Sequence, residues 1–220
     1  MHKTIENLNY IQNQINSKIL KLNNNNYKPK IIAISKTFKI DHILPLIDHG
    51  HKDFGENKVQ EALEKWSKIK SKNKNIKLHM VGKLQTNKVK FVVKLFDYIH
   101  SVDSEKLAKK IADEQSKLNK NIKIFIQVNI GKEPQKSGID PDQIGDMVAF
   151  CRDINLNVIG LMCIPPIEND ASVYFEKMKK INNSYNFNEL SMGMSSDYLD
   201  AAKNSATFLR IGSNIFGQRY

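Results

Sequence analysis

The sequence predicts a (β/α)8 barrel, or TIM barrel, preceded by one extra helix. Short apolar segments typical of strands alternate with amphipathic helical segments along the 220 residues, and this alternation indicates strands that pair in parallel. Eight strand–helix units occupy residues 31–220 and leave no stretch for a second domain. We therefore expect residues 1–220 to form a single domain, with the extra helix in residues 1–26 and the barrel in residues 31–220.

An open, doubly wound sheet is the alternative fold with the same alternation. Its dinucleotide-binding version carries a Gly-x-Gly-x-x-Gly loop after the first strand. No such loop follows the first strand candidate in this chain. The residues therefore favour the closed barrel, and the open sheet remains the alternative.

The extra helix is predicted by apolar residues that recur at helical spacing. They are Ile5, Leu8, Ile11, Ile15, Ile19 and Leu22. The asparagine run at residues 23–26 predicts a loop that ends this helix. The first strand follows at Ile31–Lys36, and Asp41 is expected to cap a short helix that Gly50 ends.

Seven further strand candidates follow, each bounded by polar or turn-forming residues. They lie at residues 53–55, 77–82, 98–102, 122–130, 157–164, 189–194 and 208–212. The segments between them carry apolar residues at helical spacing. Asp140 is expected to cap a helix that Pro141 opens, and Ser195 or Ser196 is expected to cap the helix after the seventh strand.

Composition restricts the expected macromolecular partners. The net charge is +11 and the isoelectric point is about 9.5, a balance that favours polyanions. However, the lysines are not interleaved with aromatic residues and form no recognised nucleic-acid motif. We expect weak, salt-sensitive contact with polyanions and no specific nucleic-acid partner.

The hydropathy pattern predicts a cytoplasmic protein. No apolar run approaches the roughly 18 residues that a membrane helix needs, and residues 1–20 carry no apolar block of the signal-peptide kind. Cys151 and Cys163 are the two cysteines, and their spacing predicts reduced structural thiols and no metal site. We expect no membrane partner, and the many exposed lysines favour a monomer.

One lysine stands where a barrel places its chemistry, at the carboxyl ends of the strands. Side chains alternate along the first strand candidate, so Ile32, Ile34 and Lys36 share one face. If the two isoleucines fill the barrel, Lys36 lies at its mouth. A partly desolvated amine loses some preference for its charged form, and a neutral amine attacks aldehydes, which predicts a Schiff base. A solvated lysine at a strand end is the alternative.

The last strand candidate supplies a second part of the same site. Arg210 and Gly212 lie on one face of it, and Gly212 allows a ligand to approach the backbone closely. Ser213 stands where a short helix is expected to begin, and backbone N–H groups at a helix start bind phosphate. Ser195, at the end of the seventh strand, brings a hydroxyl to the same place. Strands eight and one are neighbours in a closed barrel, so the amine and the phosphate-binding turn would face the same ligand. The predicted ligand is therefore an aldehyde with a phosphate arm, such as pyridoxal 5'-phosphate. A plain turn at residues 211–214, without a phosphate, is the alternative.

These segments resemble the pyridoxal phosphate homeostasis protein family (YggS/PROSC). In order, the matching segments are "AISKT", "FGENKVQEAL", "LHMVGKLQTNKVK", "KSGI", "GLMCIPP", "ELSMGMSSD" and "LRIGSNIFGQR". The resemblance implies a barrel like the N-terminal domain of alanine racemase that binds pyridoxal 5'-phosphate through a lysine and has no established catalytic reaction. By position, Lys36 would hold the cofactor as an aldimine and Arg210 would face the pyridine nitrogen. The residues implied at the phosphate are Gly212, Ser213 and Ser195, with Ser191 as a further candidate.

The resemblance also implies residues around the mouth. Asn57 and His79 would line it, and Lys136 would lie on a loop near the cofactor. Two positions depart from the family pattern. Ser213 stands where many relatives have threonine, which keeps a hydroxyl and an N–H group, and Lys58 replaces a common aromatic residue at the rim.

Arg210 bears on whether such a protein catalyses a reaction. A guanidinium has donors but no acceptor, so it keeps a facing pyridine nitrogen unprotonated, and an unprotonated cofactor is a poorer electron sink. Alanine racemase takes a second acid or base, a tyrosine, from an additional C-terminal domain, whereas this chain ends at Tyr220. We therefore expect no enzyme but a carrier that limits free aldehyde and releases the cofactor to apo-enzymes as transient partners. An amino-acid racemase, and a Schiff-base aldolase that uses the carbonyl of its own substrate, are the alternatives.

Overall fold

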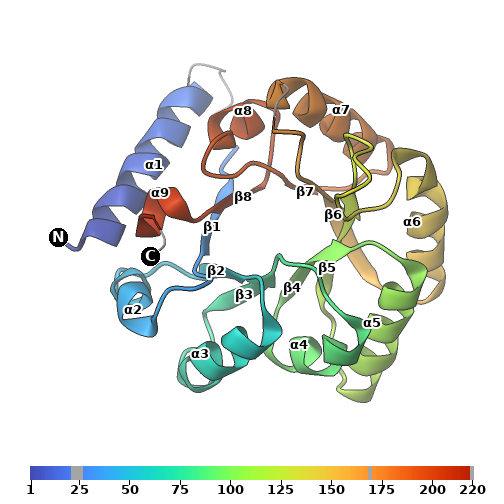
Figure 1. Ribbon diagram of the computed structural model, residues 1–220, viewed down its shortest axis with the longest axis horizontal. Coiled ribbons are helices and arrows are strands. Elements are labelled where there is room, and N and C mark those ends of the chain that lie inside the picture. Colours follow the sequence, from blue (N-terminus) through green and yellow to red (C-terminus); the bar gives the residue numbers. More distant parts are fainter. Residues whose placement is uncertain (21–26, 168–169, 219–220) are drawn as a thin grey trace.

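The computed structural model describes residues 1–20, 27–167 and 170–218. In this part of the chain, eight parallel strands close into a barrel in the order β1 to β8, and β1 pairs with β8. Helices surround the ring of strands on the outside (Figure 1). The predicted (β/α)8 barrel is confirmed, and the open-sheet alternative is wrong.

Six strands (β1, β3 and β5 to β8) end earlier than the sequence predicts, β4 ends as predicted, and β2 ends one residue later. The strands are β1 (Lys30–Ile34), β2 (Asp53–Glu56), β3 (Lys77–Met80), β4 (Tyr98–Val102), β5 (Lys123–Val128), β6 (Asn157–Cys163), β7 (Glu189–Ser191) and β8 (Phe208–Ile211). The helices are α1 (Lys3–Leu20), α2 (Ile40–Asp48), α3 (Val59–Lys72), α4 (Val89–Leu95), α5 (Glu105–Lys117), α6 (Ile144–Asp153), α7 (Ala171–Ser184), α8 (Tyr198–Lys203) and α9 (Ser213–Phe216), with 3-10 turns η1 (Thr86–Lys88) and η2 (Pro141–Gln143). None of these helices is long and apolar enough to cross a bilayer.

The extra N-terminal helix is present as α1. Its buried face packs on α2, α8 and α9, and Figure 1 shows it beside α9 at the edge of the barrel. Asn7 Nδ2 also donates a hydrogen bond to the Ile215 carbonyl at 2.9 Å. Leu22 and the asparagine loop lie outside the described residues.

Two cores follow from the alternation of side chains along the strands. Ile32 and Ile34 face inward and pack with Phe125, Met162 and Phe208 inside the barrel. Ile31 and Ala33, which alternate with them on β1, face outward into the larger core between the strands and the helices. The prediction that the two isoleucines fill the barrel is confirmed.

Two predicted helix caps are wrong. Helix α2 begins after Lys39, so Asp41 lies in its first turn and does not cap it. Helix α8 follows Asp197, and neither Ser195 nor Ser196 caps it. The Ser195 hydroxyl instead accepts a backbone N–H from the neighbouring β8–α9 turn.

Two other predicted boundaries are confirmed. The Asp140 side chain accepts the Asp142 N–H and forms a capping box with Gln143, and Pro141 opens the η2 turn. Gly50 follows the C-cap of α2 with φ of +92°, a left-handed conformation that favours glycine.

Candidate functional site

Most of the residues predicted for the site line one cavity at the C-terminal mouth of the barrel. Its volume is about 390 Å³, within the range of small-molecule sites. The lining residues are Ile34, Lys36, Asn57, Val81, Ile164, Met194, Ser195, Ser196, Arg210, Gly212 and Ser213. Six of the eight residues expected from the sequence are among them, whereas His79 and Ser191 are not.

Lys36 reaches this cavity from a turn and not from the strand itself. Strand β1 ends at Ile34, so the prediction that Lys36 is its last residue is wrong. Thr37 adopts φ of +69°, which turns the chain away from the barrel. Its backbone N–H donates to the Glu61 carboxylate at 2.5 Å, and this bond helps a non-glycine residue to keep the left-handed conformation.

A buried charge cluster supports the same turn from behind. Glu56 is completely buried, and its Oε1 accepts from Ser35 Oγ at 2.7 Å, Trp66 Nε1 at 2.8 Å and Lys65 Nζ at 2.9 Å. Lys65 Nζ also donates to the Ser35 carbonyl at 2.8 Å and pairs with Glu61 at 2.8 Å. The residues on both sides of Lys36 are therefore held by α3 and β2. No sequence motif predicts this cluster as a whole, although the i,i+4 spacing of Glu61 and Lys65 is a signal for part of it.

Arg210 is a buried cation whose orientation is set by two acceptors. One terminal nitrogen donates to Ser191 Oγ at 2.7 Å, and the other donates to the Cys163 carbonyl at 2.8 Å. Burial lowers the pKa of Arg210 from its ordinary value, but a guanidinium still stays charged. Since these bonds use two of its five N–H groups, donors remain for a ligand in the cavity. Ser191 is fully buried, so it contacts Arg210 from inside the barrel and does not reach the cavity surface.

The turn between β8 and α9 presents backbone N–H groups at the same cavity. The N–H groups of Gly212 and Asn214 both point at Ser195 Oγ, at 3.3 and 3.5 Å, which are long contacts. Asn214 Nδ2 donates to the Ser195 carbonyl at 2.9 Å and ties the two loops together. A Cβ added to Gly212 would meet only Ile34, at 3.4 Å or more, so packing within the protein does not require glycine there.

Asn57 is placed by a close approach between two loops. A Cβ added to Gly82 would lie 2.3 Å from the Asn57 carbonyl oxygen, so only glycine fits at this position. Lys58 is exposed and precedes α3. Lys136 donates to the Pro165 carbonyl at 2.9 Å and pairs with Glu133 at 2.6 Å, and it does not line the cavity.

The expectation that His79 lines the mouth is wrong. His79 is fully buried inside the barrel, where its ring stacks on Tyr98 with centroids 4.3 Å apart. Its two nitrogens contact Asp53 and His100, both at 3.0 Å. His100, which no sequence pattern marks as a site residue, is equally buried. The described residues contain no group of three His, Cys, Asp or Glu side chains that could hold a metal ion.

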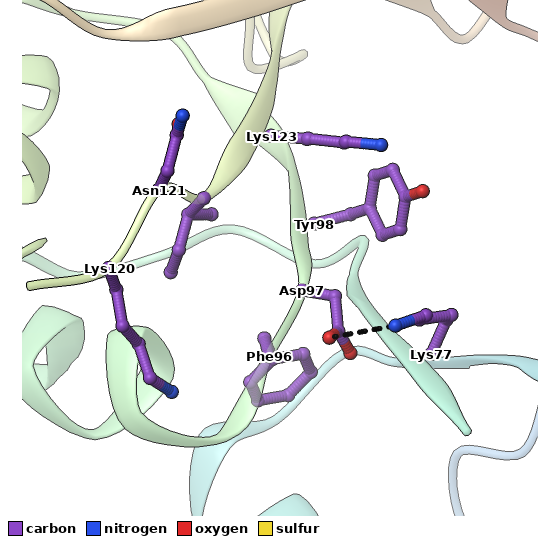
Figure 2. A pocket seen from close by; sticks show the side chains of 8 residues that line it. Lys77, Phe96, Asp97, Tyr98, Lys120, Asn121 and Lys123 are labelled. Carbon is purple, nitrogen blue, oxygen red and sulfur yellow. Dashed lines mark ion pairs between the residues drawn. The ribbon is translucent and has the colours of Figure 1, made fainter. Parts of the chain in front are cut away.

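A second cavity, of about 280 Å³, lies at the amino-terminal end of β4 and β5 (Figure 2). Its cations already have partners: Lys77 lies 3.9 Å from Asp97, and Lys123 lies over the Tyr98 ring at 5.4 Å. Lys120 donates to a backbone carbonyl of α4. The mouth cavity, where an amine, a guanidinium and backbone donors converge, is therefore the better candidate site.

Comparison with known proteins identifies the family. A family model for the N-terminal domain of alanine racemase matches residues 10–220. A Haemophilus influenzae protein named pyridoxal phosphate homeostasis protein is 35% identical over 97% of this chain and 94% of its own length. A human protein of the same name is 37% identical over 87% of this chain and 77% of its own length. The chain belongs to the pyridoxal phosphate homeostasis protein family.

Solved structures agree with this family membership. PipY of Synechococcus elongatus, solved with PLP bound, is 30% identical with a TM-score of 0.80, and the match covers 92% of this chain and 100% of PipY. An alanine racemase from Clostridium difficile has a TM-score of 0.76 at 13% identity, and the match covers 99% of this chain and 57% of the racemase. This second likeness shows the fold alone. The resemblance inferred from the sequence segments is confirmed.

Proposed function

We propose that this family member binds pyridoxal 5'-phosphate, holds it as an aldimine on Lys36 and serves in cofactor homeostasis and delivery in the cytoplasm, without catalysis. The observation that carries the proposal is the convergence, in one cavity, of the Lys36 amine, the Arg210 guanidinium and the Gly212–Ser213 turn. The PLP-bound PipY structure, at 30% identity, supports the same ligand. We further propose that the protein is a monomer and that apo-enzymes are its transient partners.

Each part of the ligand has a matching group in the cavity. The Lys36 amine would hold the aldehyde carbon through a C=N bond, with loss of water. The phosphate is bound by the N–H groups of the turn at Gly212 and Ser213 and by the Ser195 hydroxyl. Val81 and other apolar residues that line the cavity would cover the ring, as is usual in cofactor sites.

Arg210 is the reason to propose a carrier. Its remaining N–H groups could act only as donors toward a pyridine nitrogen, which would keep this nitrogen unprotonated. A bound cofactor in that state stabilises a carbanion poorly. The cavity therefore favours storage of the aldehyde over chemistry at the α-carbon of an amino acid.

The absorbance of the bound cofactor tests the linkage. Wild-type protein with added pyridoxal 5'-phosphate should show the absorbance of an imine, and borohydride should fix the added mass on the peptide that contains Lys36. Lys36→Ala should lose both signals. The matched control is Lys58→Ala, which removes an exposed lysine next to the cavity and should behave like the wild type. A wild-type protein that stays colourless with excess cofactor refutes the proposal.

Hydrogen exchange tests the absence of catalysis. Alanine and serine incubated with the loaded protein in deuterated water should keep their α-hydrogens over many hours. Rapid exchange at the α-carbon would instead indicate a racemase-type enzyme. Reactivation of an apo-enzyme by the loaded protein, faster than by Lys36→Ala with the same total cofactor, would support delivery.

A further inference from the structure

A chain of four hydrogen bonds crosses the interior of the barrel from its amino-terminal end to the mouth. Asp53 Oδ1 lies 3.0 Å from His79 Nε2, and His79 Nδ1 lies 3.0 Å from His100 Nε2. His100 Nδ1 lies 2.8 Å from Ser191 Oγ, which accepts from Arg210 at 2.7 Å. The three middle residues are completely buried, whereas Asp53 is partly exposed at the far end.

The chemistry of the two ends fixes every proton in this chain. Arg210 can only donate, so Ser191 Oγ accepts from it. With both rings neutral and the Asp53 carboxylate able only to accept, Ser191 must give its own hydrogen to His100 Nδ1. His100 therefore carries its proton on Nε2 and donates to His79 Nδ1. His79 in turn carries its proton on Nε2 and donates to the Asp53 carboxylate, which can only accept. All four bonds thus run in one direction, and both histidines are neutral Nε2–H tautomers.

The surroundings keep both rings in place. His79 stacks on Tyr98 with an interplanar angle of 9°, and His100 stacks on Phe125 with centroids 4.3 Å apart. Burial lowers the pKa of both histidines, which keeps them neutral. Burial raises the pKa of Asp53, but the hydrogen bond from His79 and nearby positive charge, including that of Lys30, leave the pKa below its ordinary value.

The hydrogen-bond chain also explains how the buried Arg210 cation is stabilised. Within the described residues, no carboxylate oxygen lies within 4.0 Å of its guanidinium, although the side chain is almost completely buried. A buried cation needs polarised acceptors. Ser191 is polarised because each donor in the chain behind it is itself hydrogen-bonded, as far as the Asp53 carboxylate.

We infer that Asp53, His79 and His100 are positioning residues, which orient Arg210 and polarise its acceptor through Ser191 from the opposite end of the barrel. The proton assignment holds for the free protein. The consequence for the ligand deepens the proposed function and rests on it, because there Arg210 sets the state of the cofactor's ring nitrogen.

The first test is a long-range ¹H–¹⁵N correlation spectrum of the histidines in the wild-type protein without ligand, at pH 8. His79 and His100 are expected as single Nε2–H tautomers, with unprotonated Nδ1 atoms. A protonated Nδ1 on either ring overturns the inference. Because this spectrum needs no cofactor, it is independent of the proposed function.

The second test removes the far end of the chain. In Asp53→Ala, His79 should lose its single tautomer, the affinity for pyridoxal 5'-phosphate should fall about threefold to tenfold, and the absorbance maximum of the bound cofactor should shift. The matched control is Glu189→Ala, which removes another carboxylate from the same end of the barrel, paired with Lys30 at 4.0 Å. It should match the wild type in all three readings.

The outcomes separate the two proposals. Unchanged tautomers, affinity and spectrum in Asp53→Ala overturn the positioning role, as does an equal loss in Glu189→Ala. If wild-type protein shows the expected tautomers but binds no cofactor, the proposed function fails, and the role of the chain at the cofactor fails with it. The proton assignment would then still stand on the first test.

Discussion

The Nζ atom of Lys65 lies 2.9 Å from Oε1 of Glu56, and both side chains are buried, at 8% and 0% exposure. The same ammonium contacts the Ser35 carbonyl and Glu61. These contacts flank Lys36 on both sides, since Glu61 also accepts the Thr37 N–H. A buried ion pair outside the cavity thus shapes the turn that presents the candidate cofactor lysine.

Lys65→Met should destabilise the protein strongly. The substitution leaves Glu56 as a buried charge without its counter-ion, and breaking one partner of such a pair costs about 3–5 kcal/mol. The free energy of unfolding in urea measures the loss, and the rate of imine formation at Lys36 should fall as well. Lys68→Met removes an exposed lysine from the same helix and should change stability by less than about 0.5 kcal/mol. Equal urea midpoints for the two variants would contradict this account.

Gly212→Ala should weaken phosphate binding while the fold stays intact. The added methyl group meets only Ile34 at ordinary contact distances, and φ of −117° suits alanine, so we expect stability within about 1 kcal/mol of the wild type. The affinity for pyridoxal 5'-phosphate should fall by about tenfold or more, whereas that for pyridoxal, which lacks the phosphate, should change little.

Gly82→Ala is the contrasting substitution. Its methyl group would lie 2.3 Å from the Asn57 carbonyl oxygen, so the backbone must shift and the thermal midpoint should drop. If Gly212→Ala instead lowers the affinities for pyridoxal 5'-phosphate and for pyridoxal equally, the turn at Gly212 does not bind the phosphate.

Stability should fall when the pH decreases below about 6.5. Burial lowers the pKa of His79 and His100 in the folded protein, whereas the unfolded chain takes up protons near the ordinary histidine pKa of about 6.5. The unfolded state thus binds more protons in acid, and the stabilisation, fully present above this pH, is lost as the pH falls. We expect a loss of about 1 kcal/mol per histidine between pH 7.5 and 5.5.

Urea midpoints at the two pH values measure this dependence. His79→Gln should reduce the dependence by removing the contribution of this ring, whereas His49→Gln, which changes an exposed histidine, should leave it unchanged. A wild-type protein that is equally stable at both values would show that the buried rings take up protons without cost.

Both cysteines should be unreactive in the folded protein. Burial raises the pKa of the Cys151 and Cys163 thiols to about 12, and the thiolate is the species that reacts with iodoacetamide. Intact-mass measurements at pH 8 should show no alkylation of native protein and two added groups in urea. Rapid labelling of the native protein would mean that the outer core opens frequently near α6 or β6.

The architecture was predictable because it depends on local burial patterns. Apolar periodicity identifies strands and helices, and their alternation leaves few topologies. The convergence of Lys36 with Arg210 and Gly212 was also predictable, since parallel strands in a barrel end on the same side and β8 neighbours β1. Two helix caps were wrong because a cap depends on which nearby acceptor the backbone reaches, and not on residue type alone.

The barrel, its extra helix and the strand ends that form the site could be predicted from the sequence, because hydropathy periods and strand order are properties of the chain. The depth of each inward side chain, in contrast, depends on how the strands pack in three dimensions. Alternation tells that His79 points inward, but its level depends on the stagger of neighbouring strands, which pairs it with Gly55 and Tyr98. That stagger places His79 within the barrel, in contact with His100 and Asp53, and leaves Arg210 at the mouth. The partners come from strands far apart in the chain, so no local pattern could have joined them.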